Sequence, residues 1–139
     1  MARSAGPKLL ERGGASWVLN ADDLEQAWEA LHAALSWLAQ AGVPVDMQAA
    51  RIVLTELIGN AVRHAGGIGE VRIEVRPAYA LLHVSDRGAG CTAKPALPDD
   101  PLSEGGRGLH LANAFASELR LLEREGGGTH AVARLPNVG

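Results

Sequence analysis

The sequence predicts an α+β fold, a two-layer sandwich in which a mostly antiparallel mixed sheet is covered on one face by three helices. Two stretches with apolar residues at helical spacing precede two pairs of strand-like segments, and a short turn joins each pair. Strands joined by a hairpin are antiparallel neighbours, and helices gathered on one face complete two layers. With 139 residues, 47% of them apolar, the chain suffices for one compact core. We therefore expect a single domain.

The N-terminal residues predict a flexible leader followed by a strand. Residues 1–14 are small, polar and rich in Gly, which is typical of a frayed terminus. The folded domain is therefore expected to span residues 15–139, with order beginning near Ser16. The stretch "SWVLN", residues 16–20, predicts a short strand.

Two helices are expected next. From Asp22 the apolar residues recur at helical spacing, Asp22 and Asp23 would lie in the first turn, and Gly42 marks the end of the helix. The second helix is expected to begin after Asp46, a plausible N-terminal cap, and to run to about Ala65, where "GGIG" interrupts it.

Hairpins and a third helix make up the remainder. Residues 71–76 alternate strictly between apolar and polar, and the more apolar residues 80–86 are expected to pair with them across "PAY". Residues 91–104 hold three prolines at three-residue spacing, which predicts an irregular surface loop. The expected later elements are a short helix over 109–117 and a hairpin of strands over 118–124 and 129–135.

Composition and charge exclude several classes of function. The formal net charge is -3 and the basic residues are scattered, so we expect no nucleic-acid partner. Apolar runs are far shorter than the roughly 20 residues that cross a bilayer, and the N-terminus lacks a signal-peptide core, which favours a cytoplasmic protein without a membrane partner. The single cysteine, Cys91, excludes a disulfide framework and a Cys cluster for zinc.

The predicted second helix carries a polar stripe. At about 100° per residue, Glu56, Asn60 and Arg63 share one face, opposite a broad apolar arc. Ile52 and Val53 flank the stripe, so the carboxylate faces a partly apolar space in which it needs a partner. Two interpretations remain open: a solvent-facing stripe with Glu56 paired to Arg63 or to another base, or a functional pair of Glu56 and Asn60.

Asp86 is a candidate binding residue in "VSDRGAG". It ends a buried-looking strand, and Gly88 and Gly90 behind it lack Cβ atoms, which lets another molecule approach the backbone. An ionised carboxylate only accepts hydrogen bonds, which suits an exocyclic amine such as that of adenine. An ordinary D-x-G turn after a strand is the alternative.

Two glycine-rich stretches complete the set. In "GGRGLHL", Gly105, Gly106 and Gly108 open a helix, whose free N–H groups and positive dipole end favour a phosphate. In "GGGTHAVARL", Thr129 begins the last strand after a tight turn. Gly-rich helix starts and hairpin turns also occur without a ligand, so each stretch is weak when taken alone.

Taken in order, these motifs resemble the N, G1, G2 and G3 boxes of the GHKL (Bergerat) ATP-binding fold shared by gyrase and histidine kinases. The boxes are E-x-x-x-N, D-x-G-x-G, G-x-G-L and G-T, and the resemblance covers about residues 16–136. Four boxes in the right order are far more specific than any one. Within that superfamily, the compact size and "ELIGNAVRHA" are most similar to bacterial anti-sigma factors with serine kinase activity.

The resemblance implies a role for each polar residue of the second helix. Asn60 would supply its amide oxygen to Mg²⁺, which keeps several waters and takes its other ligands from the triphosphate. Glu56 would act as general base or position the attacking hydroxyl. Arg63 and His64 would reach phosphate or Glu56, with an exposed helix end as the equal alternative.

It also implies how ATP would be held. Asp86 would accept from the adenine amine, Gly88 and Gly90 would admit the base, and Thr129 would add a hydroxyl near the adenine, directly or through water. Arg107 would contact phosphate or a protein partner, or would simply be solvated. The residues implied to cradle the phosphates with backbone N–H groups are Gly106, Arg107, Gly108 and Leu109.

The function so implied is that of an ATP-dependent protein serine/threonine kinase. It would act as an anti-sigma factor, bind a sigma factor, phosphorylate a small anti-anti-sigma partner of the STAS type, and form a homodimer. The alternatives are a nucleotide-gated binding module without phosphotransfer and an excised ATPase domain of a sensor histidine kinase. Two departures stand out: Gly59 where this group often has Thr, and a short, proline-bearing lid over residues 91–104.

Overall fold

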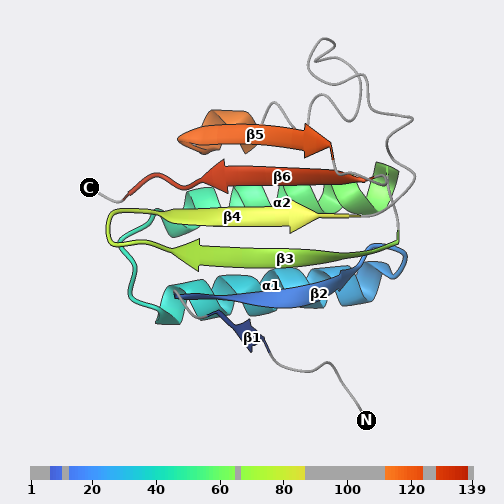
Figure 1. Ribbon diagram of the computed structural model, residues 1–139, viewed down its shortest axis with the longest axis horizontal. Coiled ribbons are helices and arrows are strands. Elements are labelled where there is room, and N and C mark those ends of the chain that lie inside the picture. The colour runs from blue at the N-terminus through green and yellow to red at the C-terminus, as the bar shows by residue number, and fades with distance from the viewer. Residues whose placement is uncertain (1–6, 11–12, 65–66, 87–111, 124–127, 138–139) are drawn as a thin grey trace.

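The computed structural model describes residues 7–10, 13–64, 67–86, 112–123 and 128–137. They form a six-stranded sheet with two long helices on one face, as Figure 1 shows. The predicted α+β two-layer architecture is confirmed. In the described part of the chain, no helix is long and apolar enough to cross a membrane.

The sheet has the strand order β1-β2-β3-β4-β6-β5. All five pairings between the described strands are antiparallel, in keeping with the mostly antiparallel sheet that the sequence predicted. The pairing of β4 with β6 joins the two predicted hairpins into one sheet. The strands are β1 (Lys8–Leu9), β2 (Gly14–Asn20), β3 (Ile68–Val75), β4 (Ala80–Ser85), β5 (Glu118–Glu123) and β6 (Thr129–Arg134).

The helices α1 (Leu24–Gln40) and α2 (Met47–His64) begin at aspartate caps. Asp23 accepts a hydrogen bond from the backbone N–H of Gln26 at 3.1 Å. Asp46 accepts from the N–H groups of the first turn of α2, as the sequence predicted. The predicted placement of Asp22 and Asp23 in the first turn of α1 was wrong, because the helix begins at Leu24 and Asp23 is its N-terminal cap. The carboxylate of Asp22 lies before the helix and accepts from the N–H of Gly67 at 3.0 Å.

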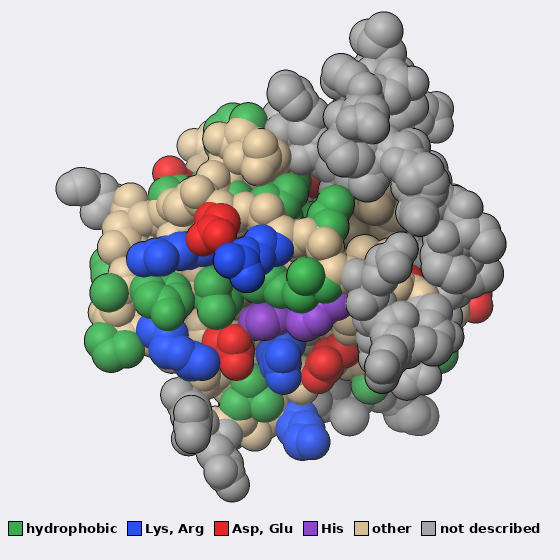
Figure 2. Space-filling view, turned by 45° about the horizontal axis from the view of Figure 1, so that its top comes forward, with side chains coloured by type: hydrophobic (Ala, Val, Ile, Leu, Met, Phe, Trp, Pro, Cys, Tyr) green, Lys and Arg blue, Asp and Glu red, His purple; other side chains and the backbone are tan. Residues whose placement is uncertain are grey.

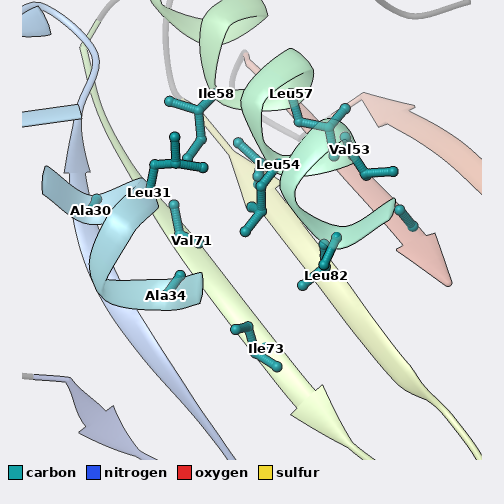
Figure 3. Packing of buried hydrophobic residues seen from close by; sticks show 14 of the residues in the cluster. Ala30, Leu31, Ala34, Val53, Leu54, Leu57, Ile58, Val71, Ile73 and Leu82 are labelled. Carbon is teal, nitrogen blue, oxygen red and sulfur yellow. The ribbon is translucent and has the colours of Figure 1, made fainter. Parts of the chain in front are cut away.

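One apolar core lies between the helices and the sheet. Every second residue of the central strands points toward the helices, in keeping with the period of two of a strand. Figure 3 shows side chains from both helices meeting side chains from β3 and β4. The labelled members of this cluster are Ala30, Leu31, Ala34, Val53, Leu54, Leu57, Ile58, Val71, Ile73 and Leu82.

The structure differs from the sequence prediction at two strand ends. Lys8–Leu9, within the predicted leader, pairs with β2 as a two-residue edge strand. The strand β3 begins at Ile68 rather than at residue 71, so Gly69 belongs to the sheet and not to the turn. Of the predicted third helix, residues 112–115 are helical, whereas its beginning and the proline-bearing loop lie outside the described residues.

Candidate functional site

The polar stripe of α2 is present in the structure. Glu56 and Asn60 are half-buried, while Leu57, Ile58 and Ala61 beside them are in the core. The apolar arc fixes the rotation of the helix against the sheet, since burial of that arc is the main stabilising interaction of such a helix. The two polar side chains are thereby held at the margin of the core.

Asn60 carries a buried acceptor that no other group satisfies. Its Oδ1 is shielded from solvent yet has no hydrogen-bond partner among the described residues. Leaving a buried acceptor unpaired costs about 1–3 kcal/mol. Such a cost at a position of a predicted site is typical of a group that meets its partner in a ligand.

Glu56 makes no ion pair or hydrogen bond with another residue of the described segments, and in particular none with Arg63. The structural alternative of a Glu56–Arg63 pair is therefore not observed. The exposed Arg63 instead lies back along the helix, where a Cβ at Gly59 would be 3.3 Å from its Nη1. His64 ends the helix, and its side chain lies outside what the structure describes.

Asp86 and Thr129 are brought together although 43 residues separate them. The backbone N–H of Thr129 donates to Oδ1 of Asp86 at 3.2 Å, and the N–H of Asp86 donates to the carbonyl of Thr129 at 3.0 Å. Asp86 is 7% exposed. The pairing of β4 with β6 thus holds a buried carboxylate at the end of one strand against the beginning of another.

These residues share one end of the molecule. Figure 1 shows the C-terminal end of α2, the end of β4 and the beginning of β6 at the same edge, and α2 packs on β4. Asp86 continues the alternation of Leu82 and Val84, so its side chain points to the helix-bearing face of the sheet. The structure therefore places the acidic residue on the side of the sheet where α2 presents Glu56 and Asn60.

The glycine-box residues that the sequence singled out lie outside the described residues. They are Gly88, Gly90, Gly106, Arg107, Gly108 and Leu109. Their assigned contacts with base and phosphates stay predictions.

Mg²⁺ fits the donor set that the described residues offer. The ion prefers oxygen ligands and usually keeps several waters, with few ligands from the protein. Asn60 Oδ1 is an oxygen donor whose bonding capacity is unused. Among the residues that the structure describes, no group of three or more His, Cys, Asp or Glu side chains could hold a metal, so a cage built by the protein alone is absent there.

A second polar cluster, on the face of the sheet opposite the helices, was missed in the sequence. His83 Nδ1 lies 2.9 Å from His130 Nε2, and His83 Nε2 lies 2.8 Å from Glu74 Oε1. Arg76 pairs with the same carboxylate at 3.4 Å. Figure 2 shows histidine side chains on this face between hydrophobic and charged ones. These residues come together only through the pairing of β4 with β3 and with β6, so no local sequence motif predicted the cluster.

The cluster favours a neutral histidine. Burial lowers the pKa of His83 below 6.5, and the hydrogen bond to Glu74 opposes this only in part. Burial raises the pKa of Glu74, but the bond to His83 and the nearby Arg72 and Arg76 outweigh it, so the pKa lies below 4.5. Because the carboxylate only accepts, a neutral His83 donates from Nε2 to Glu74 and accepts at Nδ1 from His130.

Acidification is expected to destabilise the fold through this cluster. A folded-state pKa below the unfolded value means that the unfolded chain binds more protons, so the contribution of His83 is complete above about pH 6.5 and declines below it. The loss from Glu74 begins only below 4.5. We expect the melting temperature of the wild type to fall between about pH 7.5 and pH 5.5, and His83→Gln to remove part of that fall. An equal fall in His83→Gln and in the exposed control His32→Gln would contradict this assignment.

Comparison with known families adds one finding. A family model described as "Histidine kinase-like ATPase domain" matches residues 21–135, which include both helices and the strands from β3 to β6. No curated protein matches the chain significantly. The matched region contains every residue that the sequence assigned to the site.

Proposed function

We propose that the chain, which belongs to the histidine kinase-like ATPase domain family, binds Mg-ATP and transfers the γ-phosphoryl group to a serine or threonine of a protein partner. The observation that carries the proposal is the position of Glu56. It is a half-buried carboxylate without a partner in the described residues, one turn before the unsatisfied amide oxygen of Asn60. Binding of the nucleotide alone would not require that carboxylate.

The base of ATP would be recognised by Asp86. A carboxylate has two oxygens with several acceptor positions, so it can accept from Thr129 N–H and also from an exocyclic amine. Burial strengthens such a bond, because water competes poorly for a carboxylate that is 7% exposed. Thr129, at the beginning of β6, donates its backbone N–H to this carboxylate, and its side chain would add a hydroxyl near the base.

Asn60 would hold Mg²⁺ through Oδ1. The ion would then be the partner of this buried oxygen, which has no hydrogen bond with the described residues. When bound, Mg²⁺ neutralises charge that develops on the phosphoryl oxygens during transfer. Arg63 and His64, at the end of the same helix, would lie on the phosphate side of the site.

Glu56 would receive the proton of the attacking hydroxyl, or hold that hydroxyl in line with the γ-phosphate. Its place at the margin of the core supports this role, since a carboxylate that pairs with no base in the described residues remains available as an acceptor. Alcohol side chains transfer their proton to such a carboxylate as the new oxygen–phosphorus bond forms, and ADP leaves.

Two related functions are less well supported. A nucleotide-gated binding module needs Asp86 and Asn60 but not Glu56. A sensor histidine kinase needs a phosphoacceptor His on a helix that pairs with another; His32 lies on α1, whose apolar face already packs in the core of this domain. The exposed His32 is thus not on a free dimerisation helix.

The partner and setting remain proposals that come from the motif resemblance. The similarity of "ELIGNAVRHA" to bacterial anti-sigma kinases supports a cytoplasmic protein that holds a sigma factor and phosphorylates a small STAS-type antagonist. A homodimer belongs to the same proposal.

Glu56→Ala is expected to retain ATP binding and to lose phosphotransfer. A positioned general base contributes about 10²- to 10⁴-fold to the rate, so transfer should fall by at least about a hundredfold while the Kd for Mg-ATP changes little. The assay uses labelled Mg-ATP and a candidate antagonist protein, with phosphoamino-acid analysis of the product.

Glu25→Ala is the matched control, because it removes an exposed acid from the first turn of α1, a different helix from the one that carries the stripe. It should transfer phosphate as the wild type does. Equal transfer by wild type and Glu56→Ala would remove Glu56 from the mechanism. Tight ATP binding without phosphoserine or phosphothreonine on any candidate would favour the binding module.

A further inference from the structure

Gly69 lies where the backbone of β3 passes unusually close to the segment that carries Asp86. A Cβ built at Gly69 would be 1.9 Å from the carbonyl oxygen of Ser85 and 2.8 Å from the Cα of Asp86. Both contacts are with backbone atoms, so no side-chain rotation relieves them. Only glycine is compatible with this spacing.

The Ser85–Asp86 backbone approaches Gly69 on one particular face of the sheet. Gly69 has the same parity in β3 as Val71 and Ile73, whose side chains point toward the helices. The place of its missing side chain is therefore on the helix-bearing face, and the Ser85–Asp86 backbone occupies that place. The end of β4 thus approaches β3 on the helix-bearing face, the face on which α2 presents the polar stripe.

A turn does not explain this glycine. Gly69 is absent from the glycines with positive φ, and it pairs in register with Leu19 of β2 as a regular strand residue. An alanine could adopt its backbone conformation, so the requirement is for space alone. That space is filled by the two residues at the end of β4.

We propose that Gly69 is a positioning residue that sets the selectivity for adenine, an inference that rests on the proposed function. It acts through Asp86: a side chain at 69 displaces the end of β4, and with it the carboxylate that accepts from the exocyclic amine. The hydrogen bond between Asp86 and Thr129 N–H fixes the other side of the same carboxylate. Gly69 and Thr129 together define where the acceptor lies.

The test compares ATP with inosine triphosphate, in which a carbonyl oxygen replaces the exocyclic amine. Binding of each nucleotide is measured by calorimetry with Mg²⁺ in excess. Since a hydrogen bond to a charged group discriminates by about tenfold or more, the wild type should prefer ATP by that factor. Gly69→Ala should reduce the preference to about unity by losing affinity for ATP, whereas a merely structural role would weaken both nucleotides alike.

Gly14→Ala is the matched control. A Cβ at Gly14 would lie 2.1 Å from the carbonyl oxygen of Ile73, a similar backbone clash at the other end of β3. Gly14 also has a φ of 139°, so its replacement should cost at least as much stability. It should keep the preference for ATP.

The possible outcomes distinguish a failure of the proposed role of Gly69 from a failure of the proposed ATP binding. A wild type that prefers ATP together with a Gly69→Ala variant that still prefers it overturns the role of Gly69 alone. A wild type that binds neither nucleotide overturns the proposed function and this inference with it.

If Gly69→Ala does not fold, a measurement on the wild type tests the proposed role of Gly69. Amide resonances of the chain are followed by NMR as each nucleotide is added. The Gly69 amide is expected to shift further with ATP than with inosine triphosphate, because contact with the amine is passed from Asp86 to the backbone against it. Equal shifts of Gly69 with both nucleotides would overturn the proposal.

Discussion

Replacement of Asp86 by asparagine is expected to lower the affinity for ATP by about tenfold to a hundredfold. The carboxylate already accepts from the N–H of Thr129 at 3.2 Å, and the adenine amine would bring a further donor. Asparagine has one carbonyl oxygen and one NH₂ group, so one of the two donors would face another donor. In a site where Asp86 is 7% exposed, water cannot readily relieve that conflict.

Inosine triphosphate serves as the internal control for this variant. Its carbonyl oxygen can accept from the new NH₂ group, so Asp86→Asn should bind it at least as well as the wild type does. The preference between the two nucleotides should therefore reverse in competition calorimetry. Unchanged affinity for ATP, or an equal loss for both nucleotides, would show that Asp86 does not contact the amine.

Asn60→Ala is expected to abolish the dependence of ATP binding on magnesium without weakening the fold. The variant lacks the oxygen donor of α2, so addition of Mg²⁺ should no longer raise the affinity. In the nucleotide-free protein the same change removes an unsatisfied buried acceptor, which costs about 1–3 kcal/mol, and introduces the best helix former. The melting temperature should then stay level or rise.

Such an opposition between function and stability would identify Asn60 as a ligand. Calorimetry with and without Mg²⁺ gives the first quantity, and thermal unfolding of the nucleotide-free chain gives the second. The matched control is Gln48→Ala, which removes an exposed carboxamide from the first turn of the same helix and should leave both unchanged. A clear loss of stability in Asn60→Ala, with magnesium dependence retained, would mean that the amide is structural.

The sequence was most informative where local chemistry decides the structure. The helical spacing predicted α1 and α2 to within a few residues, and Asp46 was predicted as the cap of α2, because capping and burial act over one or two turns. The strict alternation of residues 71–76 predicted the body of β3 for the same reason. The polar stripe with Glu56 and Asn60 followed from the period of the helix alone.

The parts that were missed depend on contacts between distant segments. "GGIG" indicated a turn, yet Gly69 lies within β3 and is required by the approach of Ser85 and Asp86. A glycine in a sequence does not distinguish a turn from close packing of two backbones. The two-residue strand β1 likewise depends on pairing with β2, since its own residues carry no strand pattern.

The same limit applies to the site. The sequence named Asp86 and Thr129 separately, but their contact requires the pairing of β4 with β6, two strands that are not consecutive in the chain. The cluster of His83, His130 and Glu74 depends on the pairing of β4 with both β3 and β6, and the sequence did not predict it.

Titration of the purified chain with ATP, by calorimetry and in the presence of excess magnesium, measures whether the site formed by α2, β4 and β6 binds the nucleotide. We expect saturable binding of one nucleotide per chain, which weakens when magnesium is chelated and when inosine triphosphate replaces ATP. Absence of any saturable binding of ATP under these conditions would mean that the chain has no Mg-ATP site.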